Sequence, residues 1–131
     1  MTPMNKREIG AYYENIVCEF LTENGIKILE RNFRCKSGEI DIVAEDNGYL
    51  SFIEVKYRAG SKYGTAEASV DLRKQKTICR VSDFYCKLHG LSEDHPRRFD
   101  VAAVNMESGV AKINYIKNAF YYIPYGSGRR Y

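Results

Sequence analysis

The chain has 131 residues, which is enough for one domain and too few for two independent hydrophobic cores. Apolar residues make up 44% of it and charged residues 28%, a balance that favours a packed globular fold over intrinsic disorder. The 20 Lys and Arg residues and the 17 Asp and Glu residues leave a formal charge of +3. A purely electrostatic nucleic-acid binder would be more basic, but this charge does not exclude nucleic acid as a partner.

The sequence gives no sign of a membrane or secretory segment. No apolar run approaches the roughly 18 residues of a transmembrane helix, and the polar segment 1–8 is unlike a signal peptide. The 4 cysteines form no CxxC pair and only 2 histidines accompany them, which disfavours a zinc ribbon or finger. We therefore expect a cytoplasmic protein with reduced thiols and no membrane association.

The pattern of apolar residues predicts a helix, three strands, a second helix and two further strands. The helices are expected at 5–24 and 71–88, and the strands at 26–34, 39–45, 49–57, 99–105 and 110–115. This order predicts an α/β fold with a mixed β-sheet flanked by helices, whose third and fourth strands run parallel. Residues 1–120 would form the single domain, and the Tyr-, Gly- and Arg-rich segment 121–131 a flexible tail.

The second and third strands are joined by Asn47-Gly48, a strong hairpin signal because both turn residues need a positive φ. If Asp46 pairs with Tyr49, paired residue numbers sum to 95, which puts Asp41 opposite Glu54 and Glu39 opposite Lys56. These four side chains would share one face of the hairpin. The other face would belong to the core through Ile40, Ile42, Ile53 and Val55.

Two carboxylates on opposite positions of a hairpin repel each other, since their Cβ atoms lie about 5 Å apart. Asp41 and Glu54 could instead serve as ligands for Mg²⁺ or Mn²⁺, with the Val55 carbonyl as a further oxygen ligand. Lys56 could then orient a water or offset charge on a phosphate. The alternative is an exposed face of surface ion pairs, each worth about 0 to 1 kcal/mol.

The same residues resemble the D…(D/E)xK signature of the PD-(D/E)XK nuclease superfamily, in Gly38-Glu39-Ile40-Asp41 followed by Glu54-Val55-Lys56. A wider set of motifs resembles, in order, the YraN family of small bacterial proteins over about residues 8 to 120. This set comprises Gly10 with Glu14, Arg31-Asn32-Phe33-Arg34, the two motifs above with Phe52-Ile53 and Arg58, Lys74-Gln75, Arg98-Phe99-Asp100-Val101 and Asn118-Ala119-Phe120.

The resemblance implies a restriction-endonuclease-like fold, similar to Holliday-junction resolvases, and a Mg²⁺- or Mn²⁺-dependent endonuclease that hydrolyses DNA, with linear and branched DNA left open as substrates. Asp41, Glu54 and Lys56 match its catalytic positions. Glu14 matches a first-helix acid that joins the metal site, and either Gln75 or its neighbour Lys74 matches a supporting position on the second helix. Glu39 lies beside this group as a further supporting residue. Ile40 stands where the superfamily name has proline, a position that varies.

Residues around the end of the third strand could bind the nucleic acid. Arg58, Lys62 and Arg73 could contact phosphates, and Tyr57 and Tyr63 could stack on bases. A solvated polar loop is the alternative. Paired cuts in duplex or branched DNA need two sites, which a homodimer would supply.

Two functions of other classes stay open. One is a non-catalytic nucleic-acid-binding module that uses a nuclease fold as a platform. The other is a protein–protein adaptor, since the chain has 11 tyrosines and aromatic residues are common at interfaces. Arg98 and Asp100, on either side of Phe99, could form an internal ion pair or contact DNA.

Overall fold

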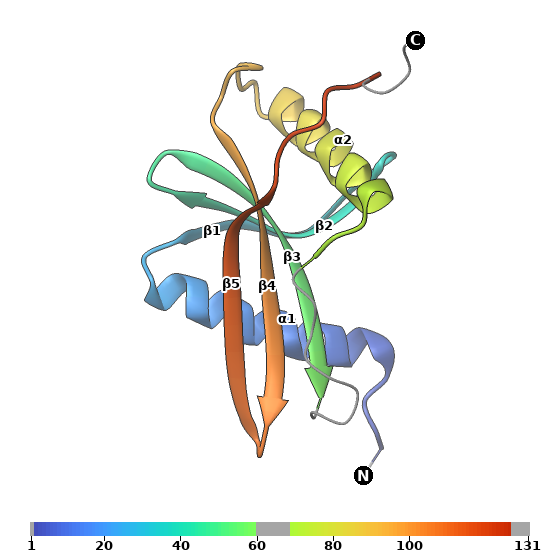
Figure 1. Ribbon diagram of the computed structural model, residues 1–131, viewed down its shortest axis with the longest axis vertical. Helices are drawn as coiled ribbons and strands as arrows, with labels where there is room; N and C mark the ends of the chain where they lie inside the picture. The colour runs from blue at the N-terminus through green and yellow to red at the C-terminus, as the bar shows by residue number, and fades with distance from the viewer. Residues whose placement is uncertain (1, 60–68, 127–131) are drawn as a thin grey trace.

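The computed structural model describes residues 2–59 and 69–126. It confirms the predicted order of elements and the mixed α/β fold, with two helices and one five-stranded sheet (Figure 1). The helices are α1 (Lys6–Glu23) and α2 (Leu72–Leu88), and the strands are β1 (Lys27–Cys35), β2 (Gly38–Asp46), β3 (Tyr49–Ala59), β4 (Arg97–Glu107) and β5 (Val110–Phe120).

Each helix begins at a side chain that satisfies free backbone N–H groups of the first turn. The Asn5 side chain accepts from the Glu8 N–H, and the Glu8 carboxylate accepts from the Asn5 N–H, which is a capping box. Asp71 caps α2 by accepting from the Lys74 N–H at 2.8 Å. The cap at Asp71 fixes where the first turn of α2 lies, and Lys74 belongs to that turn.

The strands lie in the order β1-β2-β3-β4-β5. Neighbouring strands are antiparallel except β3 and β4, which are parallel as predicted, because α2 intervenes between them in the chain. Both β4 and β5 extend beyond their predicted ends, to Glu107 and Phe120. Figure 1 shows α1 passing behind β3, β4 and β5, and α2 lying apart from it at the top of the view.

Two separate hydrophobic clusters hold the helices against the sheet. The α1 cluster contains Tyr13, Val17, Leu21, Ile26, Ile42, Ala44, Ile53, Ala102 and Val104. The α2 cluster includes Phe33, Ile40, Val43, Leu50, Phe52, Ile78, Val81, Tyr85, Phe99 and Val101. The prediction that Ile40 shares a core face with Ile42 and Ile53 is therefore wrong, because Ile40 packs in the cluster of the other helix.

A buried network of charges joins β2, β4 and β5. The Arg98 guanidinium lies 3.0 Å from Asp100 and 2.9 Å from Asp46, and all three side chains are buried. The Asn118 N–H also donates to Asp100, at 3.0 Å. The internal ion pair is thus the alternative that the structure bears out for Arg98 and Asp100.

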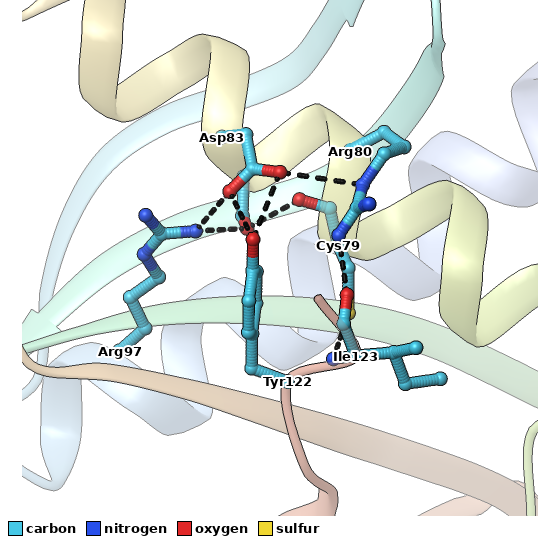
Figure 2. A network of polar contacts seen from close by, with 7 residues as sticks. Cys79, Arg80, Asp83, Arg97, Tyr122 and Ile123 are labelled. Carbon is cyan, nitrogen blue, oxygen red and sulfur yellow. Dashed lines mark hydrogen bonds and ion pairs between the residues drawn. The ribbon is translucent and has the colours of Figure 1, made fainter. Parts of the chain in front are cut away.

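The segment after β5 lies along α2 (Figure 2). The Tyr122 hydroxyl donates to the Asp83 carboxylate at 2.9 Å, and the Ile123 N–H donates to Cys79 Sγ at 3.3 Å. The Arg80 guanidinium donates to the Ile123 carbonyl. Residues 122 and 123 belong to the segment predicted to be flexible, and these contacts tie them to α2. Residues 127–131 lie outside the described residues.

No helix within the described ranges is long and apolar enough to cross a membrane. The four cysteines, all of which lie in these ranges, are free thiols.

Candidate functional site

The β2–β3 hairpin has the register that its Asn47-Gly48 turn predicts. The pairs run from Asp46↔Tyr49 to Ile42↔Ile53, so Asp41 and Glu54 are the next residues along the two strands. Beyond Ile42 the pattern changes, because the Asp41 carboxylate accepts the Val55 N–H at 2.8 Å. A side-chain carboxylate thus accepts a backbone N–H of β3 where the regular pairs end. This hydrogen bond holds Asp41 against the Glu54–Val55 segment.

The Asp41 carboxyl has a pKa raised from 3.8 to about 7. Burial is the largest cause, and the nearby Glu54 carboxylate is the second. The Val55 N–H favours the charged form and offsets part of this effect, while the charge of Glu39 adds to it. The two predicted metal ligands therefore do lie together, close enough that the charge of Glu54 disfavours the charged form of Asp41.

Of the two lysines predicted at the site, Lys74 contacts this pair, whereas Lys56 contacts the segment that leads into α2. Lys74, in the first turn of α2, places its Nζ 3.6 Å from Glu54 Oε2. Lys56 donates through its Nζ to the Ser69 carbonyl, in the segment that leads into α2. Gln75 supports this segment, since its Nε2 donates to the Val70 carbonyl at 2.8 Å. Of the two supporting residues predicted on α2, Lys74 is the one that contacts a predicted ligand.

Glu14 reaches the site from α1, on the opposite face of the sheet. Its carboxylate is buried and accepts from Asn32 Nδ2 at 3.0 Å and from Arg31 Nε at 3.2 Å. Burial is the main cause that raises the pKa of Glu14, the Arg31 side chain lowers it, and the Asp41 charge raises it further. Glu14 is thus near enough to Asp41 to feel its charge, while Arg31 and Asn32 hold its oxygen.

Sequence reasoning gave Arg31 and Asn32 no role at the site, although both belong to a motif that carries the family resemblance. The available signal was a pair of adjacent polar residues inside a predicted strand. Their contact with Glu14 joins α1 to β1 directly beside Asp41.

The predicted nucleic-acid contacts are placed unequally. Tyr57 is exposed on one ring face and stacks on Tyr13 with the other, at 4.3 Å between ring centroids. Arg58 has a buried Nε with no hydrogen-bond partner in the part of the chain that is described. Arg73 is exposed in the first turn of α2. Lys62 and Tyr63 lie outside the described residues.

Glu39 was predicted to lie opposite Lys56, and its carboxylate accepts from Arg34 Nε at 2.9 Å across the β1–β2 pair. This exposed ion pair lies at the edge of the site. Its influence on Asp41 is that of a nearby like charge.

Within the described residues, no group of three or more His, Cys, Asp or Glu side chains is arranged to enclose a metal ion. Asp41 and Glu54 nevertheless fit a hard divalent cation, because adjacent, partly buried carboxylates are the oxygen ligands that such ions take. The pKa of Asp41 is raised by burial first and by the Glu54 charge second, so a cation beside these carboxylates would favour the charged form of Asp41. The donor set is therefore compatible with Mg²⁺ or Mn²⁺ that keeps several water ligands.

The sequence profile of the Uncharacterised protein family UPF0102 matches residues 13–104. The chain belongs to this family. A UPF0102 protein of Lachnoclostridium phytofermentans is 44% identical over 89% of this chain and 96% of its own length. UPF0102 proteins of Caldicellulosiruptor bescii and Stutzerimonas stutzeri are 39% and 38% identical, over 89% and 85% of this chain and 100% and 92% of theirs.

Membership of UPF0102 confirms the expected relationship to a family of small bacterial proteins, and the names of these relatives state no nuclease activity. Among solved structures, Pyrococcus furiosus SfsA in complex with Ca²⁺ gives a TM-score of 0.41 at 15% identity. That likeness covers 85% of this chain and 62% of the SfsA chain. It is too distant to bear on the site of this UPF0102 protein.

Proposed function

We propose that this UPF0102 protein is a Mg²⁺- or Mn²⁺-dependent endonuclease that hydrolyses phosphodiester bonds in DNA. The observation that carries the proposal is the adjacency of Asp41 and Glu54 at the end of the β2–β3 pairs, with the pKa of Asp41 raised to about 7. At Asp46, by contrast, burial raises the pKa but the Lys117 and Arg98 side chains outweigh it and lower the pKa overall.

The residues of the site would have the following roles. Asp41, Glu54 and the Val55 carbonyl would hold the cation, with Glu14 nearby, and the bound cation would polarise the phosphate and lower the pKa of a water ligand. Lys56 would place a positive charge beside the phosphate, where negative charge develops in the transition state. Lys74 would orient the Glu54 carboxylate, which it contacts at 3.6 Å.

The surroundings of the site suit a polyanionic substrate. Arg58 and Arg73 lie on the two elements that frame the site, the end of β3 and the start of α2. Both could contact phosphates and so fix the DNA backbone, a contribution that would weaken as salt is added. The exposed ring face of Tyr57 offers a surface for base stacking.

The test is cleavage of supercoiled, linear and four-way-junction DNA, with an RNA arm, at pH 8 in Mn²⁺ or Mg²⁺. Asp41→Asn, Glu54→Gln and Lys56→Ala should each lower the rate by about 100-fold or more. Glu45→Gln is the matched control, because Glu45 is an exposed acid on the same strand as Asp41. Equal rates in the parent and in all three site variants would refute the assignment.

The same assay separates the other two candidate functions. DNA binding that a chelator does not change, together with no cleavage of any substrate, would support a non-catalytic binding module. An absence of nucleic-acid binding at low salt would support a protein–protein adaptor. Faster cleavage of the four-way junction than of linear duplex would support branched DNA as the substrate, and a homodimer would then show as two cuts in one binding event.

A further inference from the structure

Asn32 has a backbone conformation that is unusual inside a strand. Its φ is +52°, in the left-handed region, although it lies in the middle of β1. The pairs Arg31↔Ile42 and Phe33↔Ile40 on either side of it place Asn32 opposite Asp41. Asn is among the few residues other than Gly that adopt this region readily, whereas a β-branched residue there is a clear outlier.

At this position the side-chain alternation of both strands switches from one face of the sheet to the other. In a regular strand, residues two apart share one face of the sheet. Here Ile42 lies in the α1 cluster and Ile40 in the α2 cluster, so β2 turns over between them. On β1, Phe33 also lies in the α2 cluster, although its neighbour two residues earlier, Arg31, contacts Glu14 of α1. Asn32 and Asp41 are the two residues at which the faces exchange.

This switch explains how the side chain of Asp41 leaves the regular pattern. A strand residue at a regular position would pair through its backbone, as Ile42 does with Ile53. Asp41 instead uses its carboxylate to accept the Val55 N–H at 2.8 Å. The side-chain amide of Asn32 also donates to the buried Glu14 carboxylate at 3.0 Å, a contact separate from the backbone conformation.

We infer that Asn32 is a positioning residue, whose left-handed backbone turns Asp41 out of the sheet pattern and onto the Glu54–Val55 segment. The backbone conformation of Asn32, and not its amide contact with Glu14, carries this positioning. The geometric part of the inference stands on the structure alone, and only its consequence for DNA cleavage rests on the proposed function.

Three variants distinguish the effect of the Asn32 backbone conformation from general destabilisation of the fold. Asn32→Val imposes a residue that resists positive φ, whereas Asn32→Gly removes the amide and still permits the turn. Asn118→Val is the matched control, since Asn118 also has a left-handed backbone, with φ +57°, in the remote strand β5. Any general effect of the Asn-to-Val change in a strand appears in this control.

The main readout is hydrogen exchange of the Val55 amide, measured by NMR, because this amide donates to Asp41. A lost charge-assisted hydrogen bond should speed its exchange by about 10-fold or more in Asn32→Val. Asn32→Gly and Asn118→Val should keep the Val55 exchange rate within about 3-fold of the parent rate. This limit corresponds to a smaller free-energy change than the loss of the hydrogen bond to Asp41. The rate constant of DNA cleavage should follow the same order, with KM little changed.

Wild-type Val55 protection in Asn32→Val would overturn the inference, and so would an equal loss of protection in Asn32→Gly and Asn32→Val. If Asn32→Val does not fold, Asn32→Gly still decides, since retained protection supports the inference and lost protection overturns it. A parent protein that cleaves no DNA would end the proposed function, yet the Val55 measurement would still test the position of Asp41.

Discussion

Asp41→Asn tests the electrostatics of the site directly, because it removes one of two adjacent charges and keeps an oxygen that can accept the Val55 N–H. The pKa of Asp41 is raised from 3.8 to about 7, by burial first and by the Glu54 carboxylate second. At pH values between 3.8 and about 7, Asp41 in the folded protein keeps a proton that it has released in the unfolded chain. By linkage, the free energy of unfolding must therefore fall as the pH rises from about 4 to about 7.

The size of the effect follows from the same two values. Each pKa unit corresponds to about 1.4 kcal/mol, so the full interval is worth about 4 kcal/mol above pH 7. Relaxation of exposed neighbours, such as Lys74 towards Glu54, reduces this figure, and we expect about 2 to 4 kcal/mol. Asn carries no charge at any pH, so Asp41→Asn should recover this free energy at pH 8 and only about 1 kcal/mol at pH 4.5, where the unfolded chain has already released most of the proton.

The assay is urea unfolding of the parent and the variant at both pH values, in the presence of a chelator. Glu45→Gln should stay within about 0.5 kcal/mol of the parent at each pH, because Glu45 is an exposed acid on the same strand. Addition of Mn²⁺ at pH 8 should stabilise the parent and not Asp41→Asn, since only the parent has both carboxylates. A variant no more stable than the parent at pH 8 would refute the assignment of an uncompensated charge pair.

Two further predictions concern the frame that supports the site. In urea unfolding, Gly38→Ala should lower the free energy of unfolding by about 1 to 3 kcal/mol more than Gly109→Ala does. The reason is that a Cβ at Gly38 would lie 2.7 Å from Thr77 Cγ2, whereas a Cβ at Gly109 would meet no atom of the described chain within 4 Å. Tyr122→Phe removes a hydroxyl that donates to Asp83 and should lower the free energy of unfolding by about 0.5 to 1.5 kcal/mol, with faster proteolysis of the C-terminal segment. An unchanged urea midpoint in Tyr122→Phe would show that this contact does not hold the segment.

Much of the fold can be predicted from local patterns in the sequence. Helical periodicity and the residues that end each helix give α1 and α2 to within a residue or two. The Asn47-Gly48 turn gives the register of β2 and β3, because its backbone geometry admits few alternatives. From that register alone, the neighbourhood of Asp41 and Glu54 can be predicted, and the structure places their carboxylates together.

The contacts around the site could not be predicted in the same way, because they depend on a break in the strand pattern. Strict alternation puts Ile40 and Ile42 on one face, and it fails because Asn32 takes a left-handed conformation opposite Asp41. Composition cannot reveal this, since Asn occurs in strands, turns and loops alike. The side chains of Lys56 and Lys74 are long enough to reach several partners, so alternation assigns them a face and leaves the partner open.

The charges near Asp41 are arranged in a way that folding alone would not favour. Arg31 pairs with Glu14 and Lys74 approaches Glu54, whereas Asp41 accepts a backbone N–H in a partly buried place. Elsewhere in this chain buried charge is balanced closely, as where Arg98 meets Asp46 and Asp100. The proposed cation would account for the contrast between Asp41 and the balanced Arg98, Asp46 and Asp100 group, because a bound ligand would supply stabilisation that the free protein lacks at Asp41.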